Sequence, residues 1–181
     1  MNPSTVIPRV QSFEGRVRYM YKCTGGEVTI GFGHAIENPA EAPKLPLTID
    51  GRPANEDEIL ADYAKVAAVE KGPAAAFFAN LTQCRMADPD IDALLIADVT
   101  RFEALLEAAL PNWNTYPESA QEALFDMAYN LGISGLKDKF PHMMAAVNAG
   151  QWDVAAAECH RTGIGEPRNQ ATAALFQQAA G

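Results

Sequence analysis

The sequence predicts an α+β protein that is mostly helical. Over the C-terminal two-thirds of the chain, apolar residues recur at spacings of three and four, as in amphipathic helices. Residues 27–34 instead combine β-branched and aromatic residues with glycines, which is typical of a hairpin strand. A chain of 181 residues can bury one good core or form two small lobes that share a long helix. We therefore expect one domain over 1–181, with a hairpin-bearing lobe of about 1–70 and a helical lobe of about 71–181.

The first element is expected to be a helix over residues 6–21. Val10, Phe13 and Val17 follow a three-to-four spacing that places them on one helix face. Glu14 lies beside this face, near the end of the apolar segment. The strand of residues 27–34 comes next and is the only convincing β region in the sequence.

The middle of the chain contains many turn-forming residues. The segment from Glu37 to Pro53 is rich in proline and acidic residues, which predicts an irregular excursion or a second short hairpin. Asn55 is followed by three acidic residues, the pattern of a capped helix start. This helix is expected to end at Gly72-Pro73.

The helical part begins with the strongest amphipathic pattern of the chain, over residues 91–110. A helix over 117–131 is expected next, with Gly132 as its C-terminal stop. Shorter helices are expected over 141–149, 152–160 and 170–180.

Charge and hydropathy exclude several classes of function. The formal net charge is −9 and the pI is about 4.7, so long-range attraction to nucleic acid or to an anionic membrane is disfavoured. No stretch approaches the roughly 18 apolar residues of a membrane span, and the N-terminus lacks the apolar core of a signal peptide. We expect synthesis in the cytoplasm, so a substrate outside the cell would require release by a holin, a secretion machine or lysis.

The cysteines and histidines do not predict a metal or a cofactor. Cys23, Cys84 and Cys159 are an odd number without metal-ligand spacing, which argues against a disulfide framework and a zinc site. Cys84 and Cys159 lie in helical patterns and are expected to be small core residues. His142 and His160 have no acidic or cysteine partner at ligand spacing.

The candidate chemistry centres on Glu14. A glutamate partly buried among apolar side chains has a raised pKa and stays protonated for donation to a glycosidic oxygen. The alternative is a solvent-facing helix residue. The glycine-rich strand that follows is expected to bring a hydroxyl at Thr29 and an imidazole at His34 close to this carboxyl.

This stretch resembles the T-even phage lysozymes and related endolysins of glycoside hydrolase family 24. Glu14-Gly15, Tyr21, Gly26 and Thr29-Ile-Gly-Phe-Gly-His34 stand at the intervals of the family motif. The resemblance is weaker over 123–132, 152–156 and 167–169, and residues 37–90 fit poorly.

The resemblance implies a lysozyme-like fold in which the two lobes face each other across a cleft. It implies hydrolysis, by inversion and without a cofactor, of the β-1,4 bond between N-acetylmuramic acid and N-acetylglucosamine in a peptidoglycan strand. Glu14 would be the general acid, and Thr29 would help to hold the attacking water. The family's catalytic aspartate falls on Cys23, so the group beside the water differs in this chain.

Three interpretations of Cys23 stay open. The thiol could act as a weak base or nucleophile, a nearby carboxylate such as Glu27 could substitute, or the site could bind glycan without cleaving it. The last interpretation makes the protein a non-catalytic peptidoglycan-binding module. His34, Glu27 and Arg168 are further candidates for substrate contact, and the guanidinium of Arg161 or Arg168 could instead pair with Glu14 and orient the acid. A buried hydrogen bond is the structural alternative for His34, and a solvated surface role is the alternative for Arg161 and Arg168.

The biological setting also stays open between an endolysin and a secreted antibacterial effector. An effector would have an immunity protein as partner, and we expect the chain itself to be a monomer.

Overall fold

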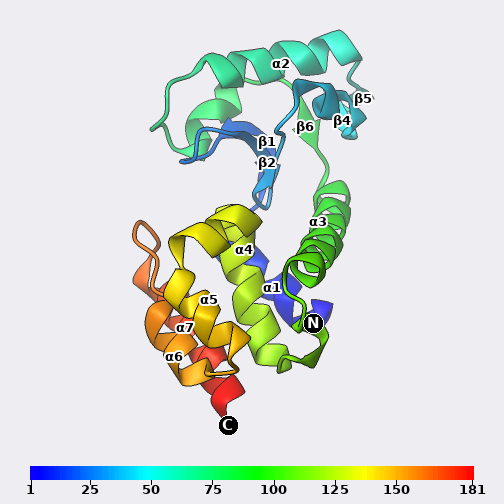
Figure 1. Ribbon diagram of the computed structural model, residues 1–181. Coiled ribbons are helices and arrows are strands. Elements are labelled where there is room, and N and C mark those ends of the chain that lie inside the picture. The colour runs from blue at the N-terminus through cyan, green and yellow to red at the C-terminus, as the bar shows by residue number, and fades with distance from the viewer. The chain divides into compact units, whose positions relative to one another are not determined.

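The computed structural model describes residues 1–181 and consists mainly of helices, with a small β region (Figure 1). This confirms the predicted α+β, mostly helical class. The chain divides into two compact units, Glu14–Asp98 and a second made of Met1–Phe13 with Val99–Gly181. The boundary expected near residue 70 falls inside the Glu14–Asp98 unit. Each unit is described by itself below.

The first helix is shorter than predicted. Helix α1 spans Pro3–Glu14, and strand β1 follows over Val17–Lys22, so the expected helix through residue 21 is wrong. Gly15 has a φ of +69°, a left-handed conformation that ends the helix. The β-branched and aromatic residues that follow pair with the next strand, and their apolar spacing fits either structure over so short a run.

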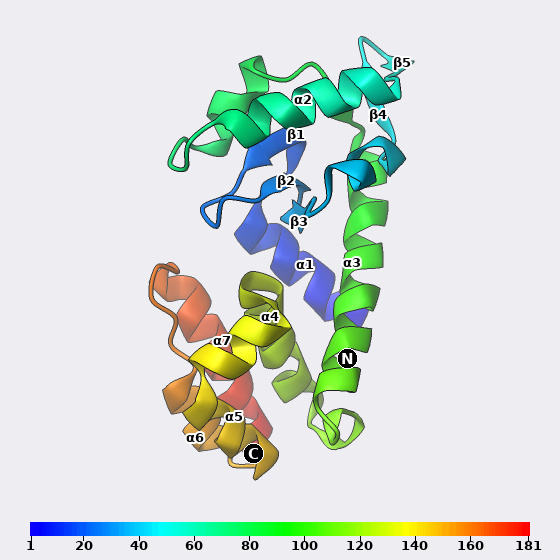
Figure 2. The ribbon, with the colours of Figure 1, turned by 45° about the horizontal axis from the view of Figure 1, so that its top comes forward.

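The predicted hairpin strand is confirmed as the centre of a three-stranded antiparallel sheet. Strand β2, Val28–Gly31, lies between β1 and the short β3, His34–Ala35. All four residues of β2 are buried. Helix α2, Glu56–Ala68, packs over β1 and β2 (Figure 2).

The segment 37–53 contains the second short hairpin that the sequence allowed. After the 3₁₀ helix η1, Pro39–Lys44, strand β4 spans Leu47–Ile49 and pairs with β5, Arg52–Pro53. Asp50 and Gly51 have φ angles of 50° and 81°, as a tight hairpin turn requires. A third strand, β6 over Arg85–Met86, pairs with the other edge of β4 and follows the 3₁₀ helix η2, Ala75–Asn80. The second sheet thus lies outside the one region that the sequence identified as convincingly β, and its strand β6 was not predicted.

Helix α2 begins as predicted and ends earlier than predicted. Asn55 and Glu58 form a capping box at its start. At its end, the Lys22 ammonium donates to the carbonyls of Ala67 and Val69 at 2.7 and 2.5 Å. A cation on the last carbonyls satisfies them without further helical turns, so the helix stops at Ala68 rather than near Gly72.

A buried carboxylate fixes the chain before β6 to helix α2. Asp62 is 2% exposed and accepts hydrogen bonds from the backbone amides of Gln83 and Cys84 at 2.6 and 2.7 Å. Lys65 donates to its other oxygen at 2.9 Å. Burial alone would raise the pKa of this carboxyl, but the hydrogen bonds outweigh it and hold the pKa below its ordinary value.

An imidazole–carboxylate pair joins β3 to the long helix α3, Asp88–Ala109. His34 Nδ1 lies 3.1 and 2.9 Å from the two oxygens of Asp98, which is 3% exposed. At the start of the same helix, Arg16 and Arg18 of the hairpin unit bond to Asp88, at 3.0 Å to its carbonyl and 2.8 Å to its carboxylate respectively. Contacts at Asp88 and at Asp98 thus attach this part of α3 to the first sheet and the residue before it.

The other unit is helical, as expected. The 3₁₀ helix η3, Trp113–Thr115, precedes helix α4, Glu118–Lys139, and the shorter helices α5, Pro141–Asn148, α6, Trp152–Glu158, and α7, Glu166–Ala180, which lie side by side (Figure 1). Gly132, with φ 72° and ψ 165°, ends the first of two helical stretches within α4, as predicted, and a second stretch follows it. Cys159 is 1% exposed in this unit and Cys84 is 0% exposed in the other, which confirms both as core residues.

We expect Asp62→Asn to destabilise the protein by about 2–3 kcal/mol at pH 7, because an amide cannot replace all the hydrogen bonds of the ionised carboxylate. The depressed pKa means that this contribution is present above about pH 4 and is lost as the pH falls through the folded-state pKa. The difference in unfolding free energy between wild type and variant should become smaller below pH 4. Urea unfolding, followed by circular dichroism, measures this difference. Asp57→Asn, at an exposed position of the same helix, is the control. A gap that does not change with pH would contradict the expectation.

We expect His34→Ala to cost about 2–3 kcal/mol of unfolding free energy, because it leaves the buried Asp98 carboxylate without the imidazole. The matched control is His160→Ala, since the His160 imidazole pairs with Glu166 at 3.3 Å in an exposed position. Such an exposed pair contributes about 1 kcal/mol or less. The same urea titration measures both variants. Equal losses of unfolding free energy would show that the contact between His34 and Asp98 does not stabilise its unit more than an exposed pair does.

Candidate functional site

Glu14 and Cys23 lie near the same phenol. Glu14 is the last residue of α1 and is half-buried, while Cys23 follows directly after β1. Burial raises the pKa of the Tyr21 hydroxyl, and the negative charges of Glu14 and Cys23 raise it further. Both groups are therefore within electrostatic reach of Tyr21. The sequence showed Tyr21 only as a motif position, without a chemical role.

The turn between β1 and β2 brings Cys23 and Glu27 into contact. The backbone closes from the Cys23 amide to the Glu27 carbonyl at 3.0 Å, and the Cys23 thiol donates to Glu27 Oε2 at 2.9 Å. A Cβ atom on Gly25 would lie 2.2 Å from this carboxylate oxygen and 3.4 Å from the cysteine sulfur. The glycine at this position therefore leaves the space in which the thiol and the carboxylate meet.

A lysine from the loop after α2 lies beside the same turn. Gly26 has a φ of +103°, and a Cβ atom there would lie 2.4 Å from Lys71 Cε. The hydrogen bond from Cys23 lowers the pKa of Glu27 most, the backbone amide of Glu27 adds to this, and the Lys71 ammonium contributes less. Glu27 is exposed, so desolvation opposes these effects only in part. The carboxylate thus stays ionised at an acidity that would protonate an ordinary glutamate.

Thr29 belongs to the same network. It is 2% exposed, and its hydroxyl donates to the Glu27 carbonyl at 3.1 Å. A hydroxyl that donates one hydrogen bond keeps lone pairs that can accept another. Hydrogen bonds therefore join Cys23, Glu27 and Thr29 at the turn between β1 and β2, whereas Glu14 precedes the other end of β1.

His34 lies one strand away and has a structural partner. Its Nδ1 faces the Asp98 carboxylate, described above, rather than a buried carbonyl. The contact supports the structural interpretation of this histidine. The partner could not be found from the sequence, because Asp98 lies 64 residues further along the chain.

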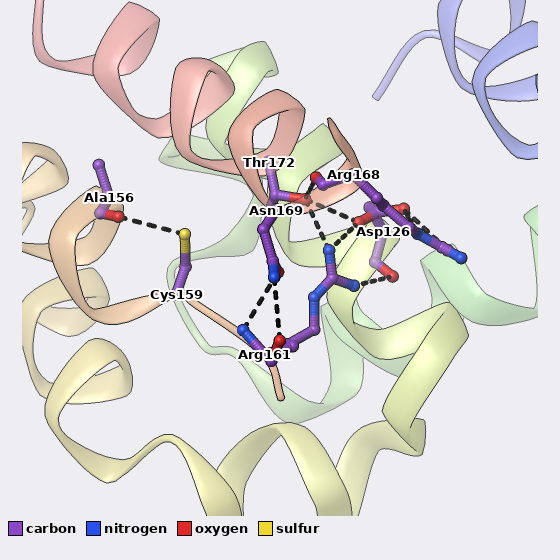
Figure 3. A network of polar contacts seen from close by, with 7 residues as sticks. All are labelled: Asp126, Ala156, Cys159, Arg161, Arg168, Asn169 and Thr172. Atoms are coloured by element: carbon purple, nitrogen blue, oxygen red, sulfur yellow. Dashed lines mark hydrogen bonds and ion pairs between the residues drawn. The ribbon is translucent and has the colours of Figure 1, made fainter. Parts of the chain in front are cut away.

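Arg168 belongs to the other unit, and the surface role expected for it and for Arg161 is wrong. Arg161 is 2% and Arg168 is 8% exposed, and both bond to the carboxylate of Asp126, at 2.6 and 2.9 Å (Figure 3). Thr172 donates to the same carboxylate at 2.8 Å. Burial would raise the pKa of Asp126, but the two guanidinium groups hold it low. The Arg168 guanidinium also lies 5.2 Å from the centre of the Phe13 ring.

Two arginines share one carboxylate in this network. Sequence reasoning considered both arginines but missed Asp126 and Thr172. Asp126 is buried in helix α4 among apolar residues. A buried carboxylate requires a charged or hydrogen-bonding partner, but the sequence does not show which residue that partner is.

A hollow of about 890 Å³ lies elsewhere in the Glu14–Asp98 unit, between β1 and the start of α3. None of the predicted site residues lines it. Its three arginines already have partners: Arg16 and Arg18 bond to Asp88, while Arg85 donates to backbone carbonyls at 2.5 to 3.0 Å. Arg16 and Arg18 are therefore paired with an acid, and the guanidinium of Arg85 is held by neutral carbonyl oxygens.

The structure contains no group of three or more histidine, cysteine, aspartate or glutamate side chains close enough to bind a metal ion. None of its helices combines the length and the hydropathy that crossing a bilayer requires.

Comparison with known proteins supplies the family. No curated protein matches the chain. The family model described as phage lysozyme matches residues 11–166, which include Glu14, the hairpin and most of the helical unit. The chain therefore belongs to the phage lysozyme family, whose members lyse peptidoglycan.

Proposed function

We propose that this protein is a muramidase that hydrolyses the β-1,4 bond between N-acetylmuramic acid and N-acetylglucosamine in peptidoglycan. Membership of the phage lysozyme family supports a peptidoglycan-lytic activity in general. The observation that favours a hydrolytic site is that Glu14 and Cys23 both lie within electrostatic reach of Tyr21, the residue that Thr29 pairs with across strands β1 and β2. Inverting glycoside hydrolysis requires a general acid and a base that activates a water molecule.

In the proposed reaction Glu14 is the general acid. Its carboxyl proton passes to the glycosidic oxygen as the bond from this oxygen to C1 of the muramic acid breaks. A water molecule held through the free lone pairs of Thr29 attacks C1 from the opposite face of the sugar and gives up its proton to a base. Inversion at C1 follows from this single displacement.

We expect Glu14→Gln to lower the turnover of Gram-negative sacculi at least ~100-fold, because an amide cannot donate the proton that the leaving oxygen needs. The assay is the release of new reducing ends, with mass spectrometry to identify fragments that end in N-acetylmuramic acid. The matched control is Glu37→Gln, which removes a carboxylate at an exposed position of the same unit. This control should keep wild-type turnover.

The same assay separates the muramidase from its alternative. Wild-type protein that sediments with sacculi but releases no reducing ends would contradict the enzyme and favour a peptidoglycan-binding module. Fragments that end in another sugar would contradict the proposed bond.

We further propose that the protein acts in the cell wall, either in lysis from within or as an effector delivered to another bacterium. In the second setting, the producing cell would protect itself with an inhibitor protein. We expect the chain to lyse a host when an added signal sequence exports it to the periplasm, and to be harmless when it stays in the cytoplasm. The optical density of induced cultures measures this. Exported Glu14→Gln is the control, and lysis by that variant would contradict a hydrolytic cause.

A further inference from the structure

We propose that Glu27 accepts, through the thiol of Cys23, the proton that the attacking water gives up. Cys23 is then the group that touches the water, and Glu27 is a positioning residue that acts behind it. This inference rests on the proposed muramidase activity and assigns its base.

The direction of the hydrogen bond supports this division of roles. The Cys23 thiol is the donor and Glu27 Oε2 the acceptor, at 2.9 Å, so in this arrangement the proton lies on sulfur and the negative charge on the carboxylate. An isolated thiol is mostly protonated at neutral pH, since its ordinary pKa is about 8.5. A thiol that can pass its own proton to a carboxylate does not need to be ionised beforehand.

The local backbone is built around this contact. The amide-to-carbonyl bond between Cys23 and Glu27 closes the turn, and Gly25 leaves the space that the carboxylate occupies. Lys71 stands on the other side, against Gly26, and adds a positive charge near Glu27. Thr29 donates to the carbonyl of the same glutamate, so the hydroxyl proposed to hold the water and the carboxylate proposed to receive its proton share one residue.

The proton step balances without any further reactant. Water gives one proton to Cys23 Sγ while Sγ gives its own proton to Glu27 Oε2. The hydroxide oxygen forms the new bond to C1, and the bond from C1 to the leaving oxygen breaks with its electron pair. That oxygen takes the proton of Glu14. The site returns to its starting state when Glu27 releases its proton and Glu14 regains one from solvent.

The test compares variants of the full chain in the sacculus assay over a range of pH. Glu27→Gln removes the acceptor, and Cys23→Ala removes the relay. Gly25→Ala keeps both groups but moves the carboxylate away from the thiol, since only the end of a flexible side chain has to give way. Glu70→Gln, an exposed carboxylate next to Lys71, is the matched control.

We expect Glu27→Gln and Cys23→Ala each to lower kcat at least ~100-fold, with the double variant no worse than either, because one relay is broken once. Gly25→Ala should lower kcat as well, and Glu70→Gln should keep it. In Glu27→Gln and Gly25→Ala, the residual activity should rise with pH toward the range in which thiols ionise, which a purely structural role of Glu27 would not produce.

Cys23→Asp provides the rescue. An aspartate at 23 can take the proton of water directly, so Cys23→Asp should be active with or without Glu27→Gln. A Glu27 requirement that persists in the presence of Asp at position 23 would overturn the relay, as would wild-type turnover by Glu27→Gln. A sugar covalently bound to Cys23 in mass spectra of quenched reactions would also overturn it, because the sulfur would then be a nucleophile.

A readout independent of activity follows from burial. Cys84 and Cys159 are buried, so alkylation of the native protein by iodoacetamide reports on Cys23. We expect Glu27→Gln and Gly25→Ala both to speed this alkylation by freeing the thiol from the carboxylate. If wild type releases no reducing ends while these alkylation rates differ as expected, the muramidase proposal fails and the contact stands. Unchanged rates in both variants would contradict the contact itself.

Discussion

A carboxylate removed from water must find donors within the protein, and this constraint holds each unit of the structure together. Asp62 joins helix α2 to the chain before β6, and Asp98 joins α3 to β3. In the other unit, Asp126 joins α4 to the segment around Arg161 and to α7. Each contact spans a large sequence separation and stabilises the fold only when every buried oxygen is satisfied. In this chain, which has a net charge of −9, these buried acids connect secondary-structure elements that are distant in sequence.

The carboxylates of the candidate site, unlike these buried acids, remain accessible to solvent. Glu27 is exposed, and Glu14 is only half-buried at the end of its helix. The pKa of Glu27 is lowered by its neighbours on the hairpin rather than by a closed cage of donors. A carboxylate that must gain or lose a proton in each cycle cannot be locked like Asp62, so the separation of rigid interior acids from accessible acids at the hairpin is what proton transfer requires.

The sequence predicted what depends on local patterns. The helices of the second half, the capped start of α2 and the strand at 27–34 all follow from spacing and capping residues. The exact end of α1 did not, because over residues 6–21 the apolar spacing fits a helix or a strand, and Gly15 and the pairing with β2 decided between them. Strand β6 and the partners of His34 and Arg168 were missed because each depends on residues far away in sequence. At the hairpin, Cys23 and Glu27 were both predicted site residues, but only the structure revealed that they touch.

The contact between Cys23 and Glu27 changes the interpretation of the cysteine at position 23. A thiol at the position where the family motif has an aspartate suggests a weakened site as long as position 23 is considered alone. Glu27 supplies a carboxylate four residues further along, and Gly25 leaves the space for it, because the turn folds the carboxylate back onto the sulfur. In the proposed relay, residues 23, 25 and 27 therefore act together. A carboxylate at 23 would make the acid at 27 and the glycine at 25 dispensable, whereas a thiol at 23 needs both.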